Sequence, residues 1–224
     1  MGQKITLKAS DGFTLDAYRA DPAGKAKGGI VLIQEIFGVN QHIRALVDEW
    51  AKAGYAVIAP ACYDRAEKNF EVGYDEEARQ KGMAARAKLD GAKTVLDYQA
   101  AHAALSGVGK IAIMGYCYGG TVAWQGAQTG PFDAAVCYYG GAIAKLLHLT
   151  NTCPVMQHNG TADPWIPPDD EAAMDAAHKP NMIIHKYPGI GHAFVNDTLP
   201  HRYHAETAKI ARGRTMAFFA KHLR

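Results

Sequence analysis

The 224-residue sequence contains no apolar run long enough to cross a membrane, and it shows no strong excess of either charge. Lys and Arg number 24 against 22 Asp and Glu, and the two signs are interspersed along the chain. No basic patch typical of nucleic-acid binding is visible. The segment 1–8 also lacks the apolar core of a signal peptide. These absences predict a cytoplasmic protein that binds neither nucleic acid nor a membrane.

Cysteine is scarce, and its spacing is not that of a disulfide framework or a zinc site. The four cysteines are Cys62, Cys117, Cys137 and Cys153. Cys137 lies inside the apolar run 134–139 and is typical of a buried core residue. His201 and His204 are expected three residues apart on the last helix, but no third ligand lies near them and no His-Glu-x-x-His motif is present. We therefore expect reduced thiols, no metal and no organic cofactor.

Apolar segments and helical segments alternate along the chain. Strands are predicted at 4–9, 13–19, 29–33, 55–59, 110–114, 134–139, 154–158 and 182–187. Helices are predicted at 41–53, over most of 75–105 with possible breaks at Gly82 and Gly91, after the strand at 110–114, at 169–178 and at 200–223. This alternation predicts an α/β fold over a single domain, 1–224: a mostly parallel sheet with an N-terminal β-hairpin and helices on both faces.

The segment 115–120, Gly-Tyr-Cys-Tyr-Gly-Gly, follows a predicted strand directly and precedes a predicted helix. It has the layout of a nucleophile elbow, with Cys117 at the position of the nucleophile. Glycine is needed at 115 and 119 because a Cβ there would collide with the neighbouring strand or helix. The helix N-terminus would favour a thiolate and a developing oxyanion. The alternative is an inert buried cysteine in a glycine-rich turn.

Two later loops contain residues that could activate this thiol. Asp163 follows the strand at 154–158, and His192 follows the strand at 182–187. The order nucleophile, acid, histidine is that of α/β-hydrolases, and all three residues would lie at the carboxyl edge of the sheet. We therefore predict a triad of Cys117, His192 and Asp163. Alternatively, Asp163 is a turn residue and His192 an ordinary loop histidine.

The loop after the strand at 29–33 is the other candidate part of the site. The backbone N–H groups of Ile36 and Tyr118 are the predicted oxyanion donors. Glu35 would place a carboxylate beside Cys117 and disfavour the thiolate, restraining the thiol until substrate arrives. The alternative for Glu35 is a cap on the helix that begins near residue 40.

Together these residues resemble the dienelactone hydrolases, or carboxymethylenebutenolidases, of the α/β-hydrolase superfamily. The resemblance covers nearly the whole chain and rests on 34–40 (Gln-Glu-Ile-Phe-Gly-Val-Asn), 115–120, Asp163 and 191–194 (Gly-His-Ala-Phe). It implies the same Cys-His-Asp triad, a glutamate that gates the thiol, here Glu35, and no cofactor. It also implies substrates that are lactones or enol esters carrying a carboxylate.

The resemblance is weaker at the residues that would hold that carboxylate. Members active on dienelactone use two arginines and a tyrosine, and Arg79 is the best match for the first arginine. Met83 stands where the tyrosine is expected, and Asn196 where the second arginine is expected. With Arg79 as the one expected cation, the pocket is predicted to prefer neutral or weakly polar substrates. Arg65 or Arg202 would otherwise hold a carboxylate.

We therefore expect a hydrolase that cleaves a lactone or activated carboxylic ester through a cysteinyl acyl-enzyme. Its expected partner is the small-molecule substrate alone, and its expected assembly is a monomer or weak homodimer. Two alternatives stay open. The same triad would serve a thioesterase or a small peptidase, and Cys117 near a helix N-terminus would also suit a non-enzymatic redox-sensing protein.

Overall fold

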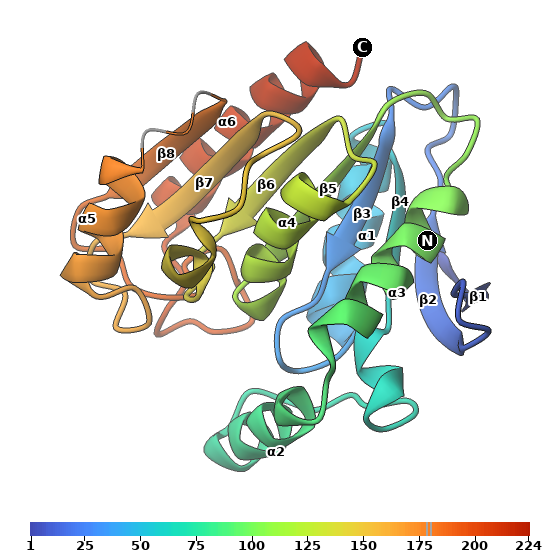
Figure 1. Cartoon of the computed structure of the whole chain (residues 1–224), viewed down its shortest axis with the longest axis horizontal. Helices are drawn as coiled ribbons and strands as arrows, with labels where there is room; N and C mark the ends of the chain where they lie inside the picture. The colour runs from blue at the N-terminus through green and yellow to red at the C-terminus, as the bar shows by residue number, and fades with distance from the viewer. Residues whose placement is uncertain (178, 180) are drawn as a thin grey trace.

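Eight strands form one sheet in the computed structural model, which describes residues 1–177, 179 and 181–224 (Figure 1). They are β1 (Gln3–Lys8), β2 (Thr14–Ala20), β3 (Gly29–Ile33), β4 (Ala56–Pro60), β5 (Ile111–Tyr116), β6 (Ala134–Tyr138), β7 (Val155–Gly160) and β8 (Met182–Tyr187). Their order is β1-β2-β4-β3-β5-β6-β7-β8. β1 and β2 form an antiparallel hairpin, β2 is antiparallel to β4, and every later pair is parallel. The predicted α/β class, mostly parallel sheet and N-terminal hairpin are confirmed.

Helices cover both faces of this sheet. The α-helices are α1 (Gln41–Lys52), α2 (Glu76–Ala87), α3 (Gly91–Ala103), α4 (Tyr118–Thr129), α5 (Pro168–Ala176) and α6 (Ala205–His222), with short 3₁₀ helices η1 (Cys62–Arg65) and η2 (Ile143–Leu146). α1 and α6 pack on one face, and α3 and α4 on the other (Figure 1). α2 stands apart from the layers, beyond the carboxyl edge of the parallel strands (Figure 1). It can therefore form a wall over whatever lies at that edge.

The central strands are apolar along their whole length because both of their faces are covered. Every residue of β3, β4 and β6 is buried. Large side chains from both helical layers complete this core, among them Trp50, Trp124 and Phe219. No helix in the described part of the chain is both long enough and apolar enough to span a membrane.

The predicted helical region 75–105 is two helices, and of the two possible breaks the one at Gly91 is confirmed. The break falls at Asp90, whose side chain accepts a hydrogen bond from the backbone of Ala92 and so caps α3. Gly82 does not interrupt α2. A Cβ at Gly82 would collide with the carbonyl oxygen of Ile36, so glycine lets α2 pack directly against the loop after β3.

The predicted C-terminal helix at 200–223 begins later than expected. His204 caps α6, so residues 200–204 form turns and an extended segment before the helix. The expectation that His201 and His204 share one helix surface is therefore wrong. The predicted helix at 169–178 corresponds to α5, and its expected last residue, His178, lies outside the described residues.

Candidate active site

Cys117 lies at the sharp turn between β5 and α4. Its backbone angles, φ 57° and ψ −117°, are unfavourable for a residue with a side chain. A Cβ at Gly115 would collide with the backbone of Gly119, and a Cβ at Gly119 would collide with the carbonyl oxygen of Ile33. The strand–turn–helix context and the strained central residue are those of a nucleophile elbow. The side chain of Cys117 is half-buried, whereas the other three cysteines are fully buried.

His192 and Asp163 form a hydrogen-bonded pair beside this turn. Nδ1 of His192 lies 2.7 Å from Oδ2 of Asp163, and both side chains are nearly inaccessible to solvent. Oδ1 of Asp163 accepts a second hydrogen bond, at 2.8 Å, from the backbone N–H of Trp165. The carboxylate is thus held from two sides, and the imidazole is oriented with Nε2 left for another partner.

The environment of His192 favours its protonated form. Burial by itself lowers the pKa of His192, but the neighbouring Cys117 sulfur and the Asp163 carboxylate stabilise the imidazolium and raise that pKa to about 10. The ring of Tyr139 packs edge-on against the imidazole with the two ring centres 4.7 Å apart. The His192 imidazole therefore interacts with the Cys117 sulfur as well as with the Asp163 carboxylate, as a base that activates this thiol requires.

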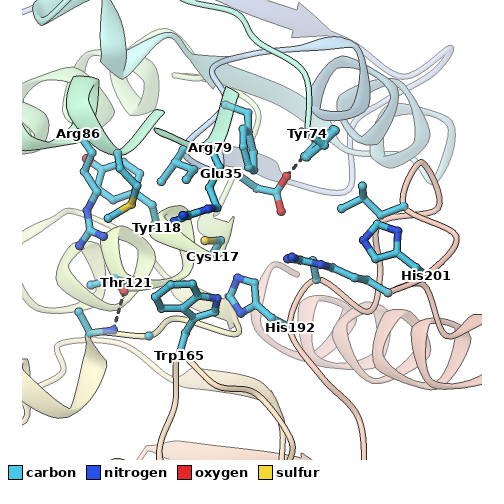
Figure 2. Close-up of a pocket in the computed structure, with 18 of the residues that line it drawn as sticks. Glu35, Tyr74, Arg79, Arg86, Cys117, Tyr118, Thr121, Trp165, His192 and His201 are labelled. Carbon is cyan, nitrogen blue, oxygen red and sulfur yellow. Dashed lines mark hydrogen bonds between the residues drawn. The ribbon is translucent and has the colours of Figure 1, made fainter. Parts of the chain in front are cut away.

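Glu35 lies on the other side of Cys117 (Figure 2). Its side chain is 2% exposed, and Oε2 accepts a hydrogen bond of 2.9 Å from the Tyr74 hydroxyl. The alternative in which Glu35 caps α1 is wrong. That cap is Asn40, whose side chain accepts a hydrogen bond from the backbone N–H of Ile43 at 3.1 Å.

The two predicted oxyanion donors line the same cavity as Cys117. Tyr118 is the first residue of α4, where backbone N–H groups have no partner inside the helix. Ile36 lies in the loop after β3, and α2 packs against its carbonyl oxygen at Gly82. The segment after β5, which contains Tyr118, and the segment after β3, which contains Ile36, thus meet at the cavity over Cys117.

A cavity of about 240 Å³ opens over Cys117 (Figure 2). Its walls come from α2, from the segment that includes η2, and from the loops that follow β7 and β8. Besides the residues already named, the side chains of Phe37, Arg79, Met83, Arg86, Thr121, Lys145, Leu199, His201 and Arg202 contribute to it.

The expectation that Arg79 is the one cation of this pocket is wrong. Arg86, Lys145 and Arg202 also line it, whereas Glu35 is the one acidic side chain among its described lining residues. Arg79 and Arg86 belong to α2, Lys145 to η2 and Arg202 to the turn before α6. The cations therefore surround the cavity from three separate segments of the chain.

These cations differ in how far they are already neutralised. Arg79 is paired with Glu76 on the same helix at 2.5 Å. Arg86 stacks its guanidinium over the ring of Tyr118, with 5.4 Å between the guanidinium carbon and the ring centre. Neither Lys145 nor Arg202 forms an ion pair with an acid in the described part of the chain. The pocket consequently carries a net positive charge.

Arg65, proposed above as an alternative carboxylate holder, is excluded from that role. Its side chain is 8% exposed and forms ion pairs with Asp97 at 2.8 Å and with Asp11 at 2.9 Å. It also stacks on the ring of Phe13. Arg65 therefore ties η1 to α3 and to the N-terminal hairpin, away from the cavity.

Of the other two residues expected to contact substrate, Met83 lines the cavity and Asn196 does not. Asn196 is fully buried, and its Oδ1 accepts hydrogen bonds from the backbone N–H and the hydroxyl of Thr198. A substrate in the cavity cannot reach Asn196 unless the surrounding residues rearrange.

Sequence reasoning missed several residues of this wall. Arg86 could have been found, because Arg79, Met83 and Arg86 are spaced i, i+4 and i+7 and so share one face of α2. Lys145 comes from the short 3₁₀ helix η2 and Trp165 from a turn, and neither follows such a periodicity. Within residues 1–177, 179 and 181–224, no three His, Cys, Asp or Glu side chains gather as a metal site would require.

The chain matches the model of the "Dienelactone hydrolase family" over residues 15–223. The carboxymethylenebutenolidase of Pseudomonas putida is 31% identical over 226 residues, covering 96% of this chain and 95% of the relative. Carboxymethylenebutenolidase 1 of Cupriavidus pinatubonensis is 29% identical over 228 residues, covering 98% of this chain and 96% of the relative.

Solved structures agree with these sequence matches. A candidate dienelactone hydrolase from Klebsiella pneumoniae superposes with a TM-score of 0.82 at 29% identity and covers 99% of both chains. The dienelactone hydrolase-like promiscuous phosphotriesterase P91, from metagenomic libraries, gives a TM-score of 0.76 at 18% identity, a likeness of fold alone.

Proposed function

The chain belongs to the dienelactone hydrolase family, and we propose that it hydrolyses a lactone or activated carboxylic ester through an acyl-enzyme formed on Cys117. One observation carries this proposal. A cysteine in the strained geometry of an elbow lies beside a histidine that is itself held by a buried aspartate at 2.7 Å. These are the parts that nucleophilic catalysis by a thiol requires.

In the acylation step, the Cys117 thiolate attacks the carbonyl carbon of the substrate. A carbon–sulfur bond forms, and the carbonyl π electrons move to the oxygen, where the N–H groups of Ile36 and Tyr118 donate hydrogen bonds. The tetrahedral intermediate then collapses and the bond from carbon to the leaving oxygen breaks. That oxygen takes the proton from the His192 imidazolium, which Asp163 keeps in place.

In the deacylation step, water attacks the thioester. His192, now neutral, takes a proton from the water as the new carbon–oxygen bond forms, and the carbon–sulfur bond breaks. The products are a carboxylic acid, the Cys117 thiolate and the protonated His192, so the resting state is restored. A thiolate is expelled more easily than a poor alkoxide leaving group, so we expect enol, aryl and strained lactone substrates to react best.

The charge of the cavity supports an anionic substrate. A carboxylate that enters a partly dry pocket costs several kcal/mol unless donors or cations meet it. Arg86, Lys145 and Arg202 line the cavity that contains Cys117, and arginine can bind a carboxylate through two parallel hydrogen bonds. We therefore replace the sequence-based preference for neutral substrates with a preference for a lactone or ester that carries a carboxylate.

Trapping of the intermediate tests the mechanism. The protein is mixed with 4-nitrophenyl acetate, quenched in acid within the first turnovers, and measured by intact-mass and peptide-mass spectrometry. We expect one added acetyl group, located on Cys117 and absent from Cys117→Ala. A folded Cys117→Ala variant that turns over the ester at the wild-type rate contradicts the proposal.

The same experiment with a panel of acyl donors separates the alternatives. An ester and lactone hydrolase accumulates or turns over acyl groups from activated oxygen esters. A thioesterase or peptidase favours thioester or amide donors, and a redox-sensing thiol protein turns over none of them.

A further inference from the structure

Glu35 is a buried carboxylate held by a phenol rather than by a cation. Its side chain is 2% exposed, and the Tyr74 hydroxyl donates to Oε2 at 2.9 Å. Glu35 forms no ion pair within the part of the chain that the structure describes, and Arg79 of α2 is paired with Glu76 instead. A buried carboxylate stays ionised only where donors or charges compensate the lost water. The Tyr74 hydroxyl is therefore an important donor for this charge.

Asn196 is a second buried polar residue that bears on Tyr74. Oδ1 of Asn196 is occupied by the backbone N–H and hydroxyl of Thr198, at 3.0 and 2.6 Å. The remaining end of the amide, Nδ2, is buried without a hydrogen-bond partner at normal distance. The amide is close enough to the Tyr74 hydroxyl to influence its ionisation. Thr198 thus holds the Oδ1 end of the amide, while Nδ2 is left without a hydrogen-bond partner among the described residues.

We infer that Tyr74, oriented by Asn196, is a positioning residue that holds the Glu35 carboxylate in place beside Cys117. This inference rests on the proposed function and on the restraint of the Cys117 thiol by Glu35 that the sequence predicts. It also gives a role to Asn196, which lies outside the cavity wall. Thr198 holds the Asn196 amide and Tyr74 holds the Glu35 carboxylate, in each case through hydrogen bonds from neutral groups.

The ionisation of Tyr74 agrees with its role as a donor. Burial and the Glu35 charge raise the pKa of Tyr74 well above its ordinary value, while the amides of Asn40 and Asn196 partly offset that rise. The phenol therefore keeps its proton at neutral pH.

Other charged or titratable groups surround the pair. Tyr116 of β5 and Tyr139 after β6 interact electrostatically with Glu35, and His192 interacts with Cys117. Burial raises the pKa of Tyr116 and of Tyr139, so both stay neutral over the pH range of the test below. The cavity cations named above (Arg79, Arg86, Lys145 and Arg202) line the same cavity as Glu35 and Cys117.

Alkylation of Cys117 by iodoacetamide tests the inference without any need for substrate turnover. Because the other three cysteines are fully buried, the modification reports on Cys117, and peptide mapping verifies its position. In Tyr74→Phe, Glu35 loses its donor and its carboxylate is no longer held beside Cys117, so it opposes the thiolate less. We expect the midpoint of the rate–pH profile to move to lower pH by about half a unit or more.

A double-variant comparison separates positioning from a general structural effect. Glu35→Gln should shift the midpoint in the same direction. Tyr74→Phe should then add no further shift in the Glu35→Gln background, because the charge on which it acts is gone. Tyr98→Phe is the matched control. It removes a buried tyrosine hydroxyl that is bonded to Thr129 at 2.6 Å, outside the cavity lining, and should leave the profile unchanged.

Asn196→Ala is a second variant that leaves the Tyr74 hydroxyl in place, and it should produce a smaller shift in the same direction. The inference is overturned if folded Tyr74→Phe and Asn196→Ala both keep the wild-type profile. It is also overturned if Tyr74→Phe moves the midpoint equally with and without Glu35. Failure of the proposed function would give a different result, namely hydrolysis at the wild-type rate by Cys117→Ala. That result would not affect the comparison of alkylation profiles.

Discussion

Nδ1 of His192 and Oδ2 of Asp163 lie 2.7 Å apart although 29 residues separate them in the chain. The two residues stand on loops after β7 and β8, which are neighbouring parallel strands, so the sheet register brings the loops together. Both loops open at the same edge as the elbow after β5. The pairing is thus a property of parallel topology.

The first prediction concerns pH and stability. The pKa of His192 is raised to about 10 in the folded protein, above an ordinary value of about 6.5. A raised pKa contributes stability that is fully present below about pH 6.5 and is lost as the pH rises towards 10. We expect the wild-type urea midpoint to fall between pH 7 and pH 10 more than that of Asp163→Asn.

Asp163→Asn is the appropriate comparison because it keeps Cys117, so the titration of the thiol is common to both proteins. The difference between the two slopes of urea midpoint against pH then reports how much the Asp163 carboxylate contributes to the pH dependence of stability. Parallel slopes over this pH range would show that the carboxylate does not stabilise the imidazolium.

The second prediction concerns the cationic wall of the cavity. Arg202→Ala and Arg86→Ala should each lower kcat/KM for a carboxylate-bearing lactone by roughly tenfold or more, about the value of one charge-assisted hydrogen bond. Hydrolysis of 4-nitrophenyl acetate, which carries no such charge, should change much less. Steady-state kinetics with both substrates measures the ratio.

Arg212→Ala is the control for this comparison. Arg212 lies on α6, is paired with Glu49 at 2.7 Å, and does not line the cavity over Cys117. The cavity charge does not select the substrate if Arg202→Ala and Arg86→Ala lower kcat/KM equally for both substrates. The same conclusion follows if Arg212→Ala lowers kcat/KM for the carboxylate-bearing lactone as much as they do.

The third prediction concerns the elbow. Gly119→Ala places a Cβ against the carbonyl oxygens of Ile33 and Gln34, which belong to β3 and to the loop that carries an oxyanion donor. We expect a loss of about 2 kcal/mol or more in the free energy of unfolding, as is usual when a substitution forces packed backbone apart. We also expect a loss of hydrolysis in whatever fraction stays folded.

Gly213→Ala is the matched control, since Gly213 lies inside α6 and a Cβ there would meet nothing within 4 Å. It should stabilise the protein by about 0.5–1 kcal/mol, because alanine favours a helix and restricts the unfolded chain. Thermal and urea unfolding measure both variants. Equal effects of the two substitutions would show that the close packing at Gly119 does not matter.

Local sequence determined the sheet, the elbow and the chain order of the candidate triad. A continuous apolar strand such as 110–114 can be recognised because parallel strands are buried on both faces. The glycines on either side of Cys117 can be recognised because close backbone packing excludes a side chain. Once the strands are known to be parallel, the loops with Asp163 and His192 must share an edge with the elbow.

The tertiary structure alone decided what surrounds the thiol. Arg86, Lys145 and Arg202 come from a helix, a 3₁₀ segment and a turn that are far apart in the chain, and only their packing brings three positive charges to one cavity. Asn196 follows His192 by four residues, yet its amide is bound to Thr198 in the following turn and does not line the cavity. Side-chain direction in an irregular loop depends on which hydrogen bonds the neighbouring segments complete, and no periodicity in the sequence carries that information.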